Sequence, residues 1–185
     1  MLVVGNDEET VEADLAAGRL SCPYCGAPLG RYGWARRRVL RTLGEDREMR
    51  PRRAWCARCK ATHVLLPAWS VPRRRDAAEV IVAALLAKAA GAGHRAIAAR
   101  LARPAGTVRG WLRRAAARAE PTRVDATRWV HALDPCPAPI EPSGSALGDA
   151  TRALGVALAS AVRRLGPQHS CGVLAVTAGL LSPDG

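Results

Sequence analysis

Two pairs of cysteines constrain the fold of this chain more than any other feature. In Cys22-Pro-Tyr-Cys25 and Cys56-Ala-Arg-Cys59, two residues separate the cysteines, and 30 residues separate the two pairs. Two intervening residues let both thiolates of a pair turn toward one point, and two such pairs make the closed four-thiolate site typical of structural zinc. The spacing therefore predicts one zinc ion held by all four cysteines.

Other chemistries fit this pattern less well. Disulfides are rare in a reducing cytoplasm, and neither pair lies in the βαβ pattern of thioredoxin-like redox sites. An iron–sulfur cluster uses the same four thiolates and remains an alternative. His63, four residues after Cys59, could replace a ligand, but its surroundings favour a place on a strand.

Residues 21–67 are predicted to form a zinc ribbon around this site. Strands are expected over 32–41 and 47–55, on either side of a TLGED turn, and over 62–66. Trp34 and Trp55 lie among many basic residues: Arg31, Arg36, Arg37, Arg38, Arg41, Arg50, Arg52 and Arg53. This surface is either a phosphate-contacting face, with Arg37 as a predicted contact, or a solvated sheet whose tryptophans supplement a very small core.

Residues 94–118, HRAIAARLARPAGTVRGWLRRAAAR, have the pattern of a helix-turn-helix. A short helix is followed by a break at 102–104 and by a second helix whose apolar residues recur at spacings of three and four: Val108, Trp111 and Leu112. Ala98 supplies the small side chain needed where the two helices cross. Pro104 suits the first position of the second helix, and Ala102 stands where a left-handed turn usually has Gly.

The outer face of the second helix is basic, as in helices that read the major groove of DNA. Arg109 and Arg113 are predicted to reach base edges, where Arg prefers guanine. Three neighbours are predicted to contact phosphates: Thr107, Arg114 and Arg95. An arginine-rich helix pair packed for structural reasons alone is the competing interpretation.

A further helix before this pair completes a predicted three-helix domain over 73–120. Asp76 is expected to cap that helix, with Glu79 forming a capping box. At the start of the chain, residues 1–20 form an acidic segment with a short helix over 10–17, capped by Thr10. The acidity is expected to keep this terminus soluble, and screening of the basic module is the alternative.

Residues 121–185 are predicted to be helical, with a proline-rich linker near 134–142. A helix over 121–131 is expected to pack through Val124, Trp129 and Val130. After a serine cap at 143 or 145, a long helix carries an apolar stripe: Leu147, Ala150, Leu154, Leu158, Ala161 and Leu165. A short apolar helix follows over 170–181. These helices are expected to pack on the core or, as a homodimer, on a second copy.

The charge of the chain is concentrated where the DNA contacts are predicted. The net charge is +12, with −4 on residues 1–20, +16 on residues 21–120 and none on residues 121–185. Such a block is typical of a polyanion partner, although 26 of the 28 basic residues are Arg, which also fits the codon bias of a high-GC bacterium. No basic start precedes an apolar run, and the apolar stretch 77–90 is too short to span a bilayer. A soluble cytoplasmic protein with no membrane partner is expected.

The order of the parts resembles the N-terminal half of bacterial insertion-sequence transposases: CPYCG and CARCK, a PRRR linker, then IAARLARPAGTVRGWLRR. It looks closest to transposase-like zinc-ribbon and helix-turn-helix proteins of high-GC bacteria. The resemblance covers about residues 20–120 and implies structural zinc and binding to double-stranded DNA. A transposase nuclease domain needs three carboxylates gathered from separate strands, and the acidic residues after Glu120 are not predicted to lie on strands.

The sequence thus predicts an α+β protein, mostly α, with a small zinc ribbon, a helix-turn-helix core and C-terminal helices. Its predicted function is non-enzymatic, sequence-specific DNA binding, in a transposase-derived or regulatory protein. A zinc-ribbon module that binds protein or RNA is the alternative.

Overall fold

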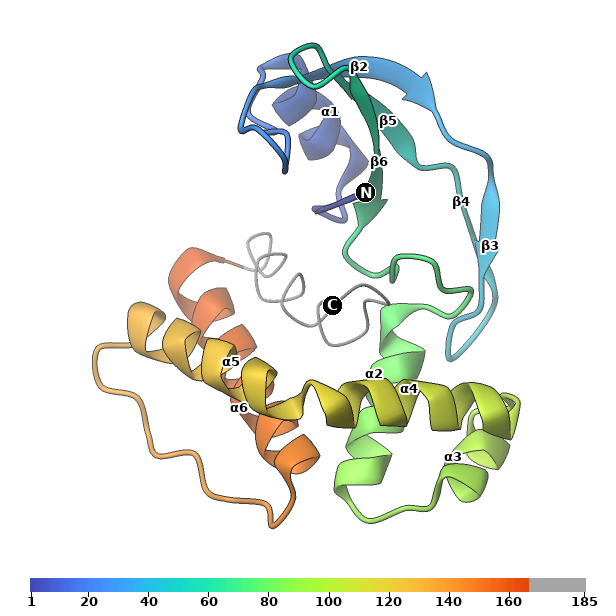
Figure 1. The fold of residues 1–185 in the computed structure, drawn as a ribbon, viewed down its shortest axis with the longest axis vertical. Coiled ribbons are helices and arrows are strands. Elements are labelled where there is room, and N and C mark those ends of the chain that lie inside the picture. The colour runs from blue at the N-terminus through green and yellow to red at the C-terminus, as the bar shows by residue number, and fades with distance from the viewer. Residues whose placement is uncertain (167–185) are drawn as a thin grey trace. The chain divides into compact units, whose positions relative to one another are not determined.

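A computed structural model describes residues 1–166 of the chain (Figure 1). The fold is α+β and mostly helical, as predicted. The chain divides into two compact units. The first, Met1–Ala77, contains the strands, and the second begins at Ala78 and is helical in its described part. Each unit has its own hydrophobic core.

The first unit is built on a four-stranded sheet with the order β1-β6-β5-β2. β5 (Arg52–Cys56) pairs antiparallel with both β2 (Leu29–Trp34) and β6 (Ala61–Pro67). β1 (Leu2–Val4) adds to the other edge of β6 in parallel. A separate two-stranded ladder joins β3 (Arg38–Leu40) to β4 (Arg47–Met49). The predicted ribbon strands are present, together with an N-terminal strand that had not been predicted.

Both long strands predicted for the hairpin are interrupted. The register between β2 and β5 shifts between Arg31 and Trp34, where Gly33 has a φ of +92°. On the opposite side Pro51, which has no N–H to donate to a ladder, separates β4 from β5. The Ala35 N–H donates to the Pro51 carbonyl at 2.8 Å across the break. A bulge of this kind bends a strand pair.

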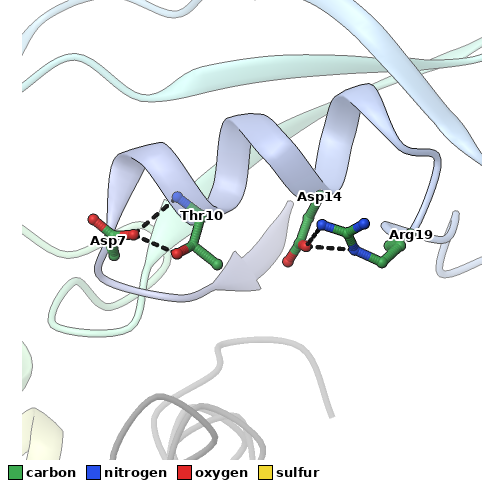
Figure 2. A network of polar contacts seen from close by, with 4 residues as sticks. All are labelled: Asp7, Thr10, Asp14 and Arg19. Atoms are coloured by element: carbon green, nitrogen blue, oxygen red, sulfur yellow. Dashed lines mark hydrogen bonds and ion pairs between the residues drawn. The ribbon is translucent and has the colours of Figure 1, made fainter.

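α1 (Glu8–Ala16) is capped by Asp7, not by Thr10 as predicted (Figure 2). The Asp7 carboxylate accepts hydrogen bonds from the Thr10 hydroxyl and from the Thr10 backbone N–H, the latter at 2.9 Å. These two bonds, that of the hydroxyl first, lower the pKa of Asp7. The helix begins earlier than predicted because Asp is a strong N-cap, and Glu8 and Glu9 then suit the positive end of the helix dipole.

The N-terminal segment is part of the ribbon's core rather than an appended acidic tail. Val11 and Leu15 of α1 pack together with Val4 of β1. The other buried members of this cluster come from the sheet and the first cysteine loop: Cys22, Leu29, Ala54, Cys56 and Leu65. One face of the sheet is therefore sealed by α1, while the acidic side chains of α1 remain outside.

The second unit begins with three helices close to their predicted positions: α2 (Ala78–Ala89), α3 (His94–Arg100) and α4 (Ala105–Ala117). All three contribute buried residues to their mutual contacts: Val80, Ile81, Ala84, Leu85, Ile97, Ala98, Val108, Trp111 and Leu112. The cap that Asp76 was predicted to form on α2 stays a prediction. Asp76 lies in the first unit's last loop, where Arg41 Nη2 is 2.7 Å from its Oδ2.

The turn between α3 and α4 has the predicted left-handed residue. Ala102 has a φ of +50°, and the next N–H, that of Arg103, donates to the Ala98 carbonyl at 2.9 Å. Pro104 is the N-cap of α4, not its first helical residue as predicted. Its ψ of 133° is extended, yet its carbonyl accepts from the Val108 N–H at 3.2 Å and so starts the helical bonding pattern.

α5 (Ala119–Leu133) and α6 (Ala146–Leu165) pack together through small residues. The buried cluster of this pair is Ala126, Val130, Ala153, Ala157 and Ala161. Leu147, Ala150 and Ala161 of the stripe predicted for α6 are buried. In the middle of the helix the prediction was wrong, because Ala153 and Ala157 are buried while Leu154 and Leu158 are only half-buried. Trp129, predicted to pack, is 41% exposed, since it lies one position before the buried Val130 on the outer side of α5.

α6 also contacts α2 and α4, so the C-terminal helices belong to the same unit as the helix pair. Ser145 caps α6 as predicted, accepting from the Gly148 N–H at 3.1 Å. The predicted linker 134–142 contains no helix or strand. The predicted helix over 170–181 lies outside the described residues. No helix within residues 1–166 has the length and apolar character needed to cross a membrane.

Candidate metal centre and nucleic-acid interface

The four predicted metal ligands converge at one end of the four-stranded sheet. Cys22 and Cys25 lie in the loop before β2, Cys56 ends β5, and Cys59 lies in the turn that leads to β6. Their four sulfurs all lie within 4.8 Å of one another, with 3.6 Å between the sulfurs of Cys25 and Cys56 and 4.0 Å between those of Cys22 and Cys59. A tetrahedron with metal–sulfur bonds of about 2.3 Å has edges of about 3.8 Å. The sulfur positions therefore fit a single four-coordinate metal ion.

Each cysteine pair is held by a tight turn. In the first, the Gly26 N–H donates to the Cys22 carbonyl at 2.9 Å, and Gly26 has a left-handed backbone (φ +71°). In the second, the Cys59 N–H points at the sulfur of Cys56, at 3.4 Å, and the left-handed position after the pair is Lys60 (φ +55°). N–H groups directed at sulfur stabilise thiolates, which are the metal-binding form of cysteine.

The proximity and partial burial of the four thiols are compatible with a bound cation. Cys22 and Cys56 are buried, Cys25 is half-buried and Cys59 is exposed, and all four are free thiols. Their proximity raises the pKa of Cys59 to about 12, first through its hydrogen bond with Cys25 and then through burial and the other two thiols. Several thiolates in one place repel each other, whereas a bound divalent ion stabilises them in their deprotonated form.

His63 occupies a strand position in β6, as its surroundings predicted, and lies beside the cluster rather than replacing a ligand. Its ring is buried, with 1% exposure, and its Nε2 is 3.5 Å from the sulfur of Cys22. The exposed ring of Tyr24 lies 5.5 Å away in a tilted arrangement. Burial, and to a lesser extent the N-terminal ammonium group, lower the pKa of His63. In the tautomer that carries the proton on Nε2, His63 would donate to the Cys22 sulfur and act as an outer partner of that ligand.

α4 is two-sided. Val108 and Trp111 are buried, whereas Arg109 and Arg113, one helical turn apart, are exposed. Arg114 is half-buried because its guanidinium folds back over Gly110. A Cβ atom placed on Gly110 would lie 3.5 Å from that guanidinium. The four predicted arginine contacts of this unit take no part in ion pairs among residues 1–166: Arg95, Arg109, Arg113 and Arg114. Their charge is therefore not neutralised within the described chain.

The N-terminus of α4 is suited to an anion. No side chain caps it, and its first turn contains no acidic residue. Thr107 lies in this turn and is half-buried, and its backbone N–H donates to the Pro104 carbonyl at 3.0 Å. Uncapped N–H groups and the helix dipole together favour a phosphate at such a position.

Arg37, the phosphate contact predicted on the ribbon, lies between β2 and β3 and is exposed. Its Nη1 is 2.7 Å from Glu48 Oε1 on β4. An exposed pair of this kind contributes roughly 0–1 kcal/mol, so it opposes a phosphate contact only weakly.

Sequence reasoning missed how the ribbon's other arginines are used. Glu12 of α1 pairs with Arg31 at 3.3 Å and with Arg52 at 2.5 Å. The guanidinium of Arg52 also lies over the Trp34 ring, 4.6 Å from its centroid. Glu12 gave no signal in the sequence, because only the packing of α1 on the sheet brings it to these arginines.

A family model described as a domain of unknown function (DUF6431) matches residues 22–111, slightly less than half of the chain. The match begins at the first cysteine of the cluster and ends at Trp111 inside α4, so it includes all four thiols and most of the helix pair. No curated protein and no solved structure matches the chain.

Proposed function

We propose that the protein is a non-enzymatic, sequence-specific binder of double-stranded DNA, with α4 as its recognition helix. The observation that carries this proposal is the two-sided character of α4. Arg109 and Arg113 are exposed and have no acidic partner among residues 1–166, while Trp111 on the opposite side fixes the helix to its core. A rigid helix that presents unneutralised arginines is what major-groove recognition requires.

In this proposal Arg109 and Arg113 contact base edges, and the residues around them contact phosphates: Thr107 at the helix N-terminus, Arg114 and Arg95. Arg37 on the ribbon adds a phosphate contact once it leaves Glu48. The resemblance to the DNA-binding half of insertion-sequence transposases supports the same reading, for a transposase-derived or regulatory protein. A homodimer formed through the C-terminal helices would place two copies of α4 on one DNA site.

We infer that zinc is the metal of the four-cysteine site. Four thiolates leave no open coordination position, and zinc in such closed sites has a structural role. Zinc would hold the loop before β2 to the end of β5, at the edge of a sheet whose core is small. The proposal places the protein in the cytoplasm, where the thiols stay reduced.

A selection of random duplex DNA by the zinc-loaded protein, read by sequencing, tests the proposal. An enriched motif is expected for the unmodified protein, and a palindromic motif would support the homodimer. Arg109→Ala should relax the preference at one position of the motif, while Arg37→Ala should weaken all sequences alike. Arg128→Ala, an exposed arginine on α5, is the matched control and should leave the motif and the affinity unchanged. Enrichment of no motif, or an unchanged motif with Arg109→Ala, would overturn the role given to α4.

A further inference from the structure

The sheet of the first unit has a second face that α1 does not cover. Because side chains alternate along a strand, Ala54 and Cys56 of β5 point into the core under α1, and Arg53 and Trp55 point to the opposite face. Tyr32 of β2 lies on this opposite face and is 53% exposed. We call Tyr32, Arg53, Trp55 and Thr62 the open ribbon face.

Two aromatic rings stack on the open ribbon face. The rings of Tyr32 and Trp55 have centroids 5.5 Å apart and planes 25° apart. Gly30 and Thr62 lie directly opposite Trp55 on the two neighbouring strands. Both are small, so they do not cover the edges of the Trp55 ring. The Arg53 guanidinium lies 5.4 Å from the Tyr32 ring centroid and is held by its hydrogen bond to the Thr62 hydroxyl, at 3.0 Å.

The charge of the two faces differs. On the covered side, the single carboxylate of Glu12 pairs with both Arg31 and Arg52 and so offsets one of their two positive charges. On the open ribbon face and in the turn that follows β5, three cations have no ion pair within residues 1–166: Arg53, Arg58 and Lys60. Arg58 and Lys60 are exposed. The open ribbon face and the turn after β5 therefore combine the exposed ring of Tyr32 and the half-buried ring of Trp55 with positive charge that has no ion pair among residues 1–166.

We propose that the open ribbon face binds an unpaired stretch of nucleic acid. Bases stack on Tyr32 and Trp55, and the phosphates next to them meet Arg58 and Lys60. Stacking platforms of this composition bind single strands with little sequence preference, because every base has a π-face. Duplex DNA competes poorly for the platform, since its bases are already stacked on one another. This site is separate from α4 and does not depend on the function proposed for that helix.

The test measures the binding of fluorescent single strands to the full chain by anisotropy, with oligothymidylate, oligouridylate and a mixed-sequence duplex as probes. Tyr32→Ala should weaken single-strand binding about tenfold, as expected for the loss of one stacking ring. Tyr32→Phe, which keeps the ring, should retain the affinity. Trp129→Ala, which removes an exposed ring from α5, is the matched control and should change nothing.

A second variant, Arg58→Gln, avoids the sheet altogether and should lower both the affinity and its dependence on salt. Zinc content reports whether each variant keeps its fold. The proposal is supported if Tyr32→Ala abolishes the binding of either single strand and Tyr32→Phe keeps it. Comparing the affinities for oligothymidylate and oligouridylate then shows whether the ligand is single-stranded DNA or RNA. The proposal is overturned if the unmodified chain binds no single strand. It is also overturned if both Tyr32→Ala and Arg58→Gln bind single strands as tightly as the unmodified chain does. The duplex selection with Arg109→Ala tests α4 alone, so its result does not depend on whether the open ribbon face binds single strands.

Discussion

The Nε2 atom of His63 lies 3.5 Å from the sulfur of Cys22, inside the first unit. The two residues are 41 positions apart in the chain, and their meeting joins the loop before β2 to β6. With a metal bound, the Nε2–H tautomer of His63 would donate to the Cys22 thiolate and fix its orientation.

We therefore predict that His63→Leu lowers zinc affinity about tenfold or more, as expected for loss of an outer partner of a ligand. His63→Gln, whose amide N–H can take the place of Nε2–H, should retain most of the affinity. Competition with a chromophoric chelator measures both. Equal affinity in the two variants would show that the contact between His63 and Cys22 does not support the metal.

Metal removal should make the four cysteines of the cluster reactive and should lower the stability of the ribbon. A chelator added to the zinc-loaded protein is expected to make Cys22, Cys25, Cys56 and Cys59 reactive toward a thiol reagent, because the metal no longer holds them as ligands. Cys56→Ser should give the same loss of zinc without chelator, while Cys136→Ser, at an exposed cysteine outside the cluster, should not. Zinc analysis together with thiol titration checks this. A visible absorption band from iron in the purified protein would contradict the assignment of zinc.

The cluster of four cysteines could be predicted from the sequence because its signal is local. Two residues between cysteines are enough to define a turn, so each pair is visible by itself. The helix pair is visible for a similar reason, since Ile97, Val108 and Trp111 follow the helical repeat and are all buried.

What could not be predicted depends on contacts between distant segments. The apolar run at Leu2–Val4 is too short to identify as a strand until β6 lies beside it. The buried side of α6 was misjudged only in the middle of the helix, because leucines outweigh alanines in a hydrophobic pattern, whereas close helix packing selects the small residues Ala153 and Ala157. The ion pairs of Arg31 and Arg52 likewise depend on the placement of Glu12.

The left-handed Ala102 in the turn between α3 and α4 predicts a stabilising substitution. Its φ of +50° is unfavourable for any residue with a Cβ. Ala102→Gly should therefore raise the free energy of unfolding by roughly 0.5–1 kcal/mol, the strain relieved minus the entropy that Gly adds to the unfolded chain. Ala99→Gly, at an exposed position inside α3, is the control and should lower it by about 1 kcal/mol. Urea unfolding followed by the helical circular dichroism signal distinguishes the two. Destabilisation by both variants would mean that Ala102 is not strained.

The alanine interface between α5 and α6 predicts a site that does not accept larger residues. Ala157 has no exposed surface and lies in the cluster with Ala126 and Val130. Ala157→Leu adds three carbons where the helices approach closely, so it should destabilise the second unit by about 1–3 kcal/mol through overpacking. Ala159→Leu makes the same change on the exposed side of α6 and should have little effect. If thermal unfolding shows the two variants to be equally stable, α5 and α6 do not pack closely at Ala157, and the predicted stripe that runs through Leu154 and Leu158 is the better description of α6.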